Sequence, residues 1–292
     1  MESFFQTQFT VRRYECDLYG HVNNAIYLRY LQEAADRLIC SDAVQTCQPG
    51  NYTFSPKQIE IEYLTPLKYG ERVEVRLDPY CSQTGELFLN AELVRMKPEE
   101  VAARAQVLAA VHPVGIEQAE VFPGNLFPDI SAEQNDFSPF PNPPAPPPGT
   151  YRMRTHVRWE DTNADQQVDS AILSNYIEAC GYRVIAAHGW PVERMLAEGM
   201  AILLRRNQIE ILHPISFGDE LEIATWFSAV KRVTALRHYS IVKLGETLFD
   251  RIEVARVHSL GVWVDLKSGH PVRIPTQMLV DFSPNRSTED WP

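Results

Sequence analysis

Five residues close to the N-terminus have the types and spacing of a small reaction centre. Asp17 is followed by Gly20 and His21, and then by the pair Asn23-Asn24 at the expected start of a helix. A carboxylate can attack an electrophilic carbon or activate water to do so. The first backbone N–H groups of a helix have no partner inside it and carry partial positive charge, so they can hold a developing oxyanion. The short spacing lets both groups reach one carbonyl carbon.

Each of these residues also has a structural interpretation. Asp17 can cap backbone donors in its turn, and His21 can be a hydrogen-bonding residue where the helix begins. Capping is the leading role of the Asn23 and Asn24 side chains, which leaves the backbone N–H of Asn24 as the better functional candidate. Gly20 suits a close approach of a substrate to the backbone.

Tyrosines surround the motif. Tyr27 and Tyr30 recur at helical spacing, which usually indicates packing in a core or in a pocket wall. We expect the residues that contact a substrate to include Tyr19, Gly20, Asn23 and Tyr27.

The motif occurs twice in the chain. The stretch Val11–Tyr30 returns as Val157–Tyr176, and Pro66–Val75 returns as Pro214–Ile223. The offsets are 157 − 11 = 146 and 214 − 66 = 148, so the second copy has gained two residues between these anchors. A period of this length predicts two similar domains, because solenoid repeats span only about 20–50 residues.

The two copies differ where chemistry would occur. In place of Asp17, Gly20 and His21, the second copy carries Asn163, Gln166 and Gln167. We therefore expect one reactive copy and one degenerate copy.

Hydrophobic periodicity predicts the same order of elements in both copies. The first should have a strand over Phe9–Glu15, a helix from Asn23 or Asn24 to Cys40–Val44, and strands over Ile59–Leu64, Arg72–Tyr80, Leu87–Met96 and Ala103–His112. The second should have a helix near Ser170–His188, with Gly181 as an interruption, and strands near Gln208–Leu212, Glu220–Phe227, Ala235–Leu244 and Arg256–Val264. This order indicates an α+β fold in which each antiparallel sheet wraps around one long helix.

Proline marks the boundary between the copies. We assign residues 1–120 to the first domain, 121–149 to a Pro-rich linker and 150–292 to the second domain. The prolines between Pro139 and Pro148 leave few backbone donors, so we expect a semi-rigid strap outside either sheet and without a functional role.

Composition excludes several classes of function. The net charge of −11 and the pI of about 5.2 argue against nucleic-acid binding, which requires a basic surface. The N-terminus lacks the pattern of a signal peptide, and no apolar run approaches the roughly 20 residues of a membrane span, so we expect a cytoplasmic protein. Its 5 cysteines are scattered, so we expect no metal, and we expect no organic cofactor.

Three basic pairs could meet a phosphate or an acidic carrier protein. They are Arg152/Arg154, Arg205-Arg206 and Lys231-Arg232. Scattered solvated charge is the simpler interpretation of these pairs.

The turn that leads into Gly20-His21-Val22-Asn23-Asn24 and the helix with Tyr27 and Tyr30 resembles the hotdog-fold thioesterases of the 4-hydroxybenzoyl-CoA and acyl-ACP thioesterase type. The similarity is close over Val11–Glu33, continues through Ala110 and returns over Val157–Val264. In that family two sheet-and-helix units pair, and active sites lie at their interface. The resemblance implies two such units fused in one chain, with one site lost.

The resemblance also implies roles for individual residues. Asp17 falls on the catalytic aspartate of the 4-hydroxybenzoyl-CoA type, and Asn24 falls where a backbone N–H polarises the carbonyl. The plant acyl-ACP enzymes show Asp-x-Asn-x-His-Val-Asn-Asn, with catalytic Asn and His. Asp17 and His21 match that pattern, but Tyr19 replaces its Asn.

We expect hydrolysis of an acyl thioester, carried by CoA or by acyl carrier protein, to a free acid and a thiol. A non-catalytic acyl-thioester-binding protein is the main alternative. A hotdog enoyl-thioester hydratase is a weaker alternative. In those enzymes the catalytic His follows the Asp by five residues with Asn-Pro between them, whereas here His21 follows Asp17 by four residues with no proline between them. The sequence leaves open the acyl chain, the carrier and whether whole chains form a homodimer.

Overall fold

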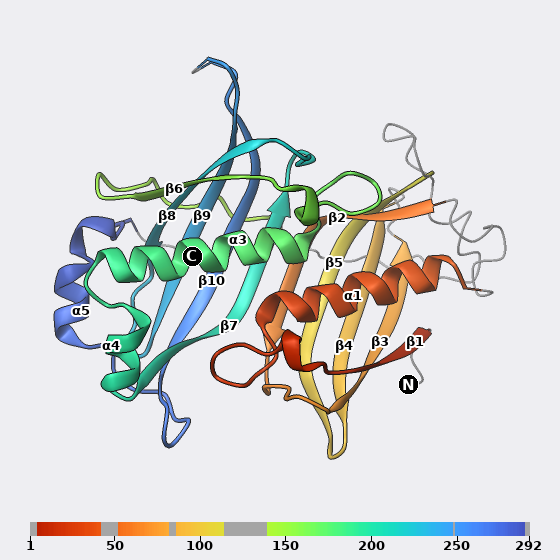
Figure 1. Ribbon diagram of the computed structural model, residues 1–292, viewed down its shortest axis with the longest axis horizontal. Helices are drawn as coiled ribbons and strands as arrows, with labels where there is room; N and C mark the ends of the chain where they lie inside the picture. The colour runs from red at the N-terminus through yellow and green to blue at the C-terminus, as the bar shows by residue number, and fades with distance from the viewer. Residues whose placement is uncertain (1–4, 42–51, 82–85, 114–138, 248, 290–292) are drawn as a thin grey trace. The chain divides into compact units, whose positions relative to one another are not determined.

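The computed structural model describes residues 5–41, 52–81, 86–113, 139–247 and 249–289. The chain forms two compact units, Met1–Pro139 and Phe140–Pro292. In each unit a long helix lies across one face of an antiparallel sheet (Figure 1). The expected α+β hotdog architecture is therefore confirmed.

The first unit has its strands in the order β1-β3-β4-β5-β2. Its elements are β1 (Phe5–Thr10), the 3-10 helix η1 (Arg13–Glu15), α1 (Asn24–Ile39), β2 (Tyr52–Tyr63), β3 (Arg72–Cys81), β4 (Leu87–Met96) and β5 (Glu99–Pro113). Alternate residues of β3, namely Val73, Val75 and Leu77, are fully buried. This period of two gives the sheet one face on the core.

Helix α1 begins where the sequence predicts. The side chain of Asn23 caps it by accepting a hydrogen bond from the N–H of Ala25 at 2.9 Å. Leu28, Leu31 and Leu38 are buried along one stripe. This amphipathic pattern holds the helix against the sheet, because the stripe removes apolar surface from water.

The second unit has its strands in the order β7-β10-β9-β8-β6. Its elements are β6 (Tyr151–His156), the 3-10 helix η2 (Trp159–Asp161), α3 (Ser170–Ala187), α4 (Val192–Ala197), β7 (Met200–Ile211), β8 (Glu220–Ser228), β9 (Thr234–Leu244), β10 (Ile252–Asp265), α5 (Thr276–Asp281) and the 3-10 helix η3 (Ser283–Asn285).

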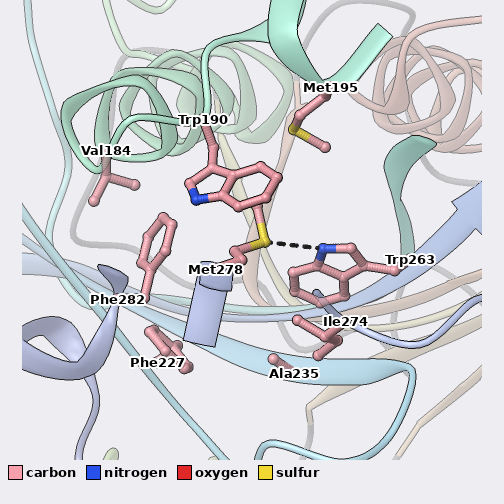
Figure 2. Close-up of a cluster of buried hydrophobic side chains, with 9 residues drawn as sticks. All are labelled: Val184, Trp190, Met195, Phe227, Ala235, Trp263, Ile274, Met278 and Phe282. Carbon is pink, nitrogen blue, oxygen red and sulfur yellow. Dashed lines mark hydrogen bonds between the residues drawn. The ribbon is translucent and has the colours of Figure 1, made fainter. Parts of the chain in front are cut away.

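The second unit extends its core beyond the C-terminal end of α3. Figure 2 shows a cluster in which Trp190, Trp263 and Met278 come together, with side chains from α4 and the α5 region around them. The indole of Trp263 donates to the sulfur of Met278 at 3.2 Å. Helices α4 and α5 each contribute a buried methionine to this cluster, which explains why such short helices persist.

Three local predictions were wrong or incomplete. The strand expected over Phe9–Glu15 stops at Thr10, because the Glu15 carboxylate accepts from the N–H of Arg12 at 2.6 Å and closes the turn of η1. Gly181 does not interrupt α3; it is buried, and a Cβ there would lie 3.0 Å from the Tyr239 hydroxyl. The sequence patterns also missed β6, α4 and α5.

The segment Phe140–Gly149, which the sequence assigns to the linker, packs against the second unit. Phe140 stacks on His258 with ring centroids 4.6 Å apart, and the indole of Trp226 donates to the carbonyl of Pro144 at 3.2 Å. Residues 121–138 of the predicted linker lie outside the described residues. None of the helices in the described ranges is both long enough and apolar enough to cross a membrane.

Candidate active site

Asp17 stabilises a tight turn through one of its two carboxylate oxygens. Oδ1 accepts hydrogen bonds from the N–H of Tyr19 at 2.9 Å and of His21 at 3.2 Å. The backbones of Asp17 and His21 close the same turn, since the Asp17 N–H donates to the His21 carbonyl at 2.7 Å. Within the described ranges, Oδ2 accepts no hydrogen bond and the carboxylate has no salt bridge. One oxygen of a half-buried carboxylate is thus available for chemistry.

The start of α1 offers one backbone donor beside this turn. The N–H of Ala25 is taken by the Asn23 side chain, and the N–H of Ile26 donates to the Asn23 carbonyl at 2.9 Å. The N–H of Asn24 has no hydrogen-bond partner among the residues that the structure describes. It therefore keeps the partial positive charge of a helix N-terminus.

The second unit builds the same turn with the amide of Asn163 in place of the Asp17 carboxylate. Oδ1 of Asn163 accepts from the N–H of Asp165 at 3.0 Å and of Gln167 at 3.1 Å. Gly20 has φ of +76°, and Gln166 at the matching place has φ of +62°. The backbone of the turn is conserved between the two units, so the change from Asp to Asn removes charge and leaves the geometry in place.

The helix start of the second unit differs in a way that the sequence analysis missed. The cap of α3 is Asp169, whose carboxylate accepts from the N–H of Ile172 at 2.8 Å, where the first unit has neutral Asn23. A negative cap opposes any oxyanion at that helix start. The aligned pair Asn23 and Asp169 was visible in the repeat and is a second difference in charge between the two copies of the motif.

Buried carboxylates fix both turns to their helices. Glu15 accepts from the Tyr30 hydroxyl at 2.6 Å, and Asp161 accepts from the Tyr176 hydroxyl at 2.7 Å. Both carboxylates are 5% exposed. Because this contact is present in both units, it supports the architecture of the turn. Sequence reasoning did not single out Glu15.

The other predicted site residues fall into two groups. The phenol of Tyr19 and the ring of His21 are half-buried, and neither side chain makes a hydrogen bond with the described parts of the chain, so both can meet a ligand. Partial burial, and then the charge of Asp17, raise the pKa of Tyr19. Tyr27 lies in the core, its hydroxyl accepts from the N–H of Leu67 at 3.1 Å, and burial raises its pKa to about 12. Packing is therefore the observed role of Tyr27, and a contact with substrate stays a prediction.

Two other surfaces do not contribute to this site. Arg152 and Arg154 form ion pairs with Glu222 at 3.0 and 3.4 Å. Their charges are therefore already paired within the unit, as the interpretation of surface charge predicts. A hollow of about 410 Å³ opens on the first unit, where Glu60 and Glu62 of β2 contribute to its acidic lining. That lining does not suit an apolar chain, and Asp17 is not part of it. No group of three or more His, Cys, Asp or Glu in the described ranges could hold a metal ion.

Comparisons with known proteins cover both halves of the chain. Residues 11–142 match the family model of the thioesterase-like superfamily, and residues 148–282 match the model of the acyl-ACP thioesterase N-terminal domain. The long-chain acyl-CoA thioesterase FadM of Escherichia coli (strain K12) is 32% identical over 125 residues, which cover 41% of this chain and 92% of FadM.

Two solved structures extend over nearly the whole chain. An acyl-ACP thioesterase from Bacteroides thetaiotaomicron has a TM-score of 0.62 at 17% identity, over 88% of this chain and 96% of its own. A putative oleoyl thioesterase from Lactobacillus plantarum has a TM-score of 0.69 at 12% identity, over 92% of this chain and 97% of its own. At these identities the two likenesses establish the fold.

Proposed function

Since this chain belongs to the hotdog-fold acyl thioesterases of the thioesterase-like superfamily, we propose that it hydrolyses an acyl thioester at the turn and helix start of its first unit, with Asp17 as the reactive carboxylate. The products are a free acid and a thiol. The substrate is an acyl-CoA or an acyl-ACP, the two carriers named in its relatives. A cytoplasmic location and a homodimer of the tandem chain stay predictions from the sequence.

The observation that carries this proposal is the pair of matching turns. Asn163 satisfies the same two backbone donors as Asp17, so the turn itself does not require a carboxylate. The unit with Asp17 also has the neutral helix cap Asn23, whereas the unit with Asn163 has the cap Asp169. The negative charge at residue 17 is therefore available for chemistry on a bound carbonyl.

The geometry suits two routes to the same products. As a general base, Asp17 takes a proton from water, the hydroxide adds to the thioester carbon, and the thiolate leaves with that proton. As a nucleophile, Asp17 adds to the carbon and expels the thiolate, and water then hydrolyses the mixed anhydride. In both routes the N–H of Asn24 stabilises the negative charge on the carbonyl oxygen.

Single turnover in H₂¹⁸O identifies the nucleophilic route when water opens the anhydride at the Asp17 carbon. Opening at the acyl carbon labels the acid in the same way as direct attack. Direct attack by water places ¹⁸O in the acid released in the first turnover. A mixed anhydride that water opens at the Asp17 carbon instead places the label in the protein, where mass spectrometry of the peptide that contains Asp17 detects it.

Release of free thiol is the test of the proposed reaction. The wild-type chain is assayed on the same acyl groups attached to CoA and to acyl carrier protein, and we expect thiol release on at least one carrier. Stabilisation by these ligands without thiol release on either would instead identify a binding protein. Hydration of an enoyl thioester without thiol release would identify a hydratase.

A further inference from the structure

The face of the second sheet that packs against α3 carries a row of polar residues. Arg237, Ser259 and Asn207 are direct neighbours across β9, β10 and β7. Tyr239, two residues along β9 from Arg237, approaches Gly181 of α3. Side chains two residues apart share a face of a strand, so the row lies on the inner side of the sheet.

The first unit has apolar residues at the matching places. At the 148-residue offset, Arg237 of the second unit corresponds to Leu89 of the first. Their strand partners, Phe227 and Pro79, correspond at the same offset. Across the sheet, Leu89 pairs with Val107, and Val107 with Ile59. All three of these apolar side chains are 1% exposed. One core thus has Leu-Val-Ile where the other has Arg-Ser-Asn.

Arg237 has little compensation for its charge. Its guanidinium makes one long hydrogen bond, to Oδ1 of Asn285 at 3.4 Å, and lies 5.7 Å from the ring centroids of Phe227 and Phe282. No carboxylate pairs with it among the described residues. Burial lowers its pKa. Charges inside proteins are normally paired, because leaving water is costly for an ion.

The helix above the sheet shows the same change of polarity. Ser174 of α3 aligns with the buried Leu28 of α1 at the 146-residue offset. The hydroxyl of Ser174 is buried and has no hydrogen-bond partner among the residues that the structure describes. Buried polar groups without partners are rare, so this one calls for an explanation.

We propose that the interior of the second unit is a binding site for an amphipathic carboxylate, with Arg237 as the residue that holds its anionic group. A guanidinium pairs well with a carboxylate, and the neighbouring polar row supplies further hydrogen-bonding groups. The rings of Phe227 and Phe282, 5.7 Å from the guanidinium, make the surroundings of this anion-binding group apolar. Arg237 is half-buried and keeps part of its surface exposed to solvent, so an anion can approach it. This site does not depend on the reaction proposed for the first unit.

Sodium octanoate is a suitable probe. Acetate is the control that carries only its charge, and octanol is the control that carries only its apolar chain. We expect octanoate to raise the Tm of the full-length chain more than either control. Arg237→Leu, which installs the residue of the first unit, should reduce the affinity for octanoate about tenfold or more, since hydrogen bonds to charged groups are strong. Arg232→Leu is the matched control, because Arg232 is exposed and has no ion pair within the described ranges.

The ionisation of bound octanoate gives a readout that requires no variant. With a ¹³C label on its carboxyl carbon, pairing with Arg237 should lower the pKa of the bound acid, whereas burial without a cation would raise it. Thiol release by Arg237→Leu should persist, so failure of this site and of the proposed reaction are distinguishable. A raised pKa, or equal octanoate binding by wild type and Arg237→Leu, would overturn the proposal.

Discussion

Asp17 and Asn163 occupy the same place in the two matching turns, and the turn requires only one side-chain oxygen of each. Each uses Oδ1 to satisfy two backbone donors of its turn, at distances that agree within 0.1 Å between the units (2.9 and 3.0 Å; 3.2 and 3.1 Å). The structural role that the sequence analysis allowed for Asp17 is therefore real, and it does not compete with a chemical role. The turn uses one oxygen, and the second remains for a substrate or a water molecule.

Tyr30→Phe tests the buried support of the turn. Phenylalanine keeps the stack on Phe9, whose ring centroid lies 4.8 Å away, but removes the hydrogen bond to Glu15. We expect the free energy of unfolding to fall by about 1.5–3 kcal/mol, because the acceptor is a charged and buried carboxylate. Urea unfolding gives the value, and Tyr176→Phe is the matched change in the second unit. An unchanged unfolding free energy for both variants would show that these contacts do not support the turns.

At the residue scale, the sequence was informative where the chemistry of a single position is distinctive. It predicted the cap at Asn23 and the free N–H at Asn24, which the structure shows, and the chemical role that it assigned to Asp17 stays a prediction. It did not single out Glu15 or Asp169, since an acidic residue near a turn has many uses and only the fold shows what it contacts. The structure also places Tyr27 inside the core, where helical spacing alone cannot separate core from pocket wall.

At the scale of elements, prediction succeeded where hydrophobic periodicity is strong. β4 was predicted with its observed bounds, and the predicted helix Ser170–His188 differs from α3 by one residue at its end. Periodicity failed for α4 and α5, because helices of six residues span less than two turns and owe their stability to the tertiary cluster around Trp190. Gly181 was misjudged because its close contact with Tyr239 is tertiary.

The outer face of the second sheet carries a buried histidine pair. His238 and His258 are cross-strand neighbours joined through their Nδ1 atoms at 2.9 Å, and Nε2 of His258 meets the carbonyl of Pro141 at 2.9 Å. A carbonyl only accepts, so His258 donates from Nε2 and accepts at Nδ1 from His238. Both rings are neutral in this arrangement. Burial is the main reason that the pKa falls to about 3 for His238 and about 4 for His258.

These pKa values predict an acid-sensitive second unit. The unfolded chain takes up protons near the ordinary histidine pKa of 6.5, and the folded unit does so only near 4 and 3. Stability is therefore complete above about pH 6.5 and is lost as the pH falls toward 4, by about 1.4 kcal/mol per pH unit for each histidine. Urea unfolding at pH 7, 6, 5 and 4 measures this slope.

The first unit supplies a control that does not titrate. Asn90 and Gln106 are also cross-strand partners, and the Gln106 amide donates to Asn90 at 3.1 Å. The double variant His238→Asn/His258→Gln transfers this pair and should flatten the dependence on pH between 6.5 and 4. A slope equal to that of the wild type would place the acid sensitivity elsewhere.

At the scale of the whole molecule, duplication has allowed the two units to diverge. The first unit combines an apolar inner face with the charged turn at Asp17. The second has an amide, Asn163, in place of that aspartate, a polar row with Arg237 on its inner face, and an outer face that contacts Phe140 and Pro144. The sequence predicted the duplication and the loss of one motif. It did not predict the polar interior, because the alternation of a strand does not say which face is covered.

Restoring the carboxylate in the second unit should not restore a site. We expect Asn163→Asp, made in the Asp17→Asn background, to release no more thiol than that background, since Asp169 keeps a negative charge at the start of α3. A steady-state thiol assay on both variants measures the difference. Recovered turnover would show that the charge of the helix cap does not matter.

The most direct test of the proposed role of Asp17 is kcat/KM for thiol release by Asp17→Asn, measured beside urea unfolding of the same preparation. Because the second unit already builds this turn with Asn163, the variant should unfold at the wild-type urea concentration. We predict a loss of about 100-fold or more in kcat/KM, the usual effect of removing a general base. A fully folded Asp17→Asn variant that hydrolyses thioesters at the wild-type rate would contradict the account.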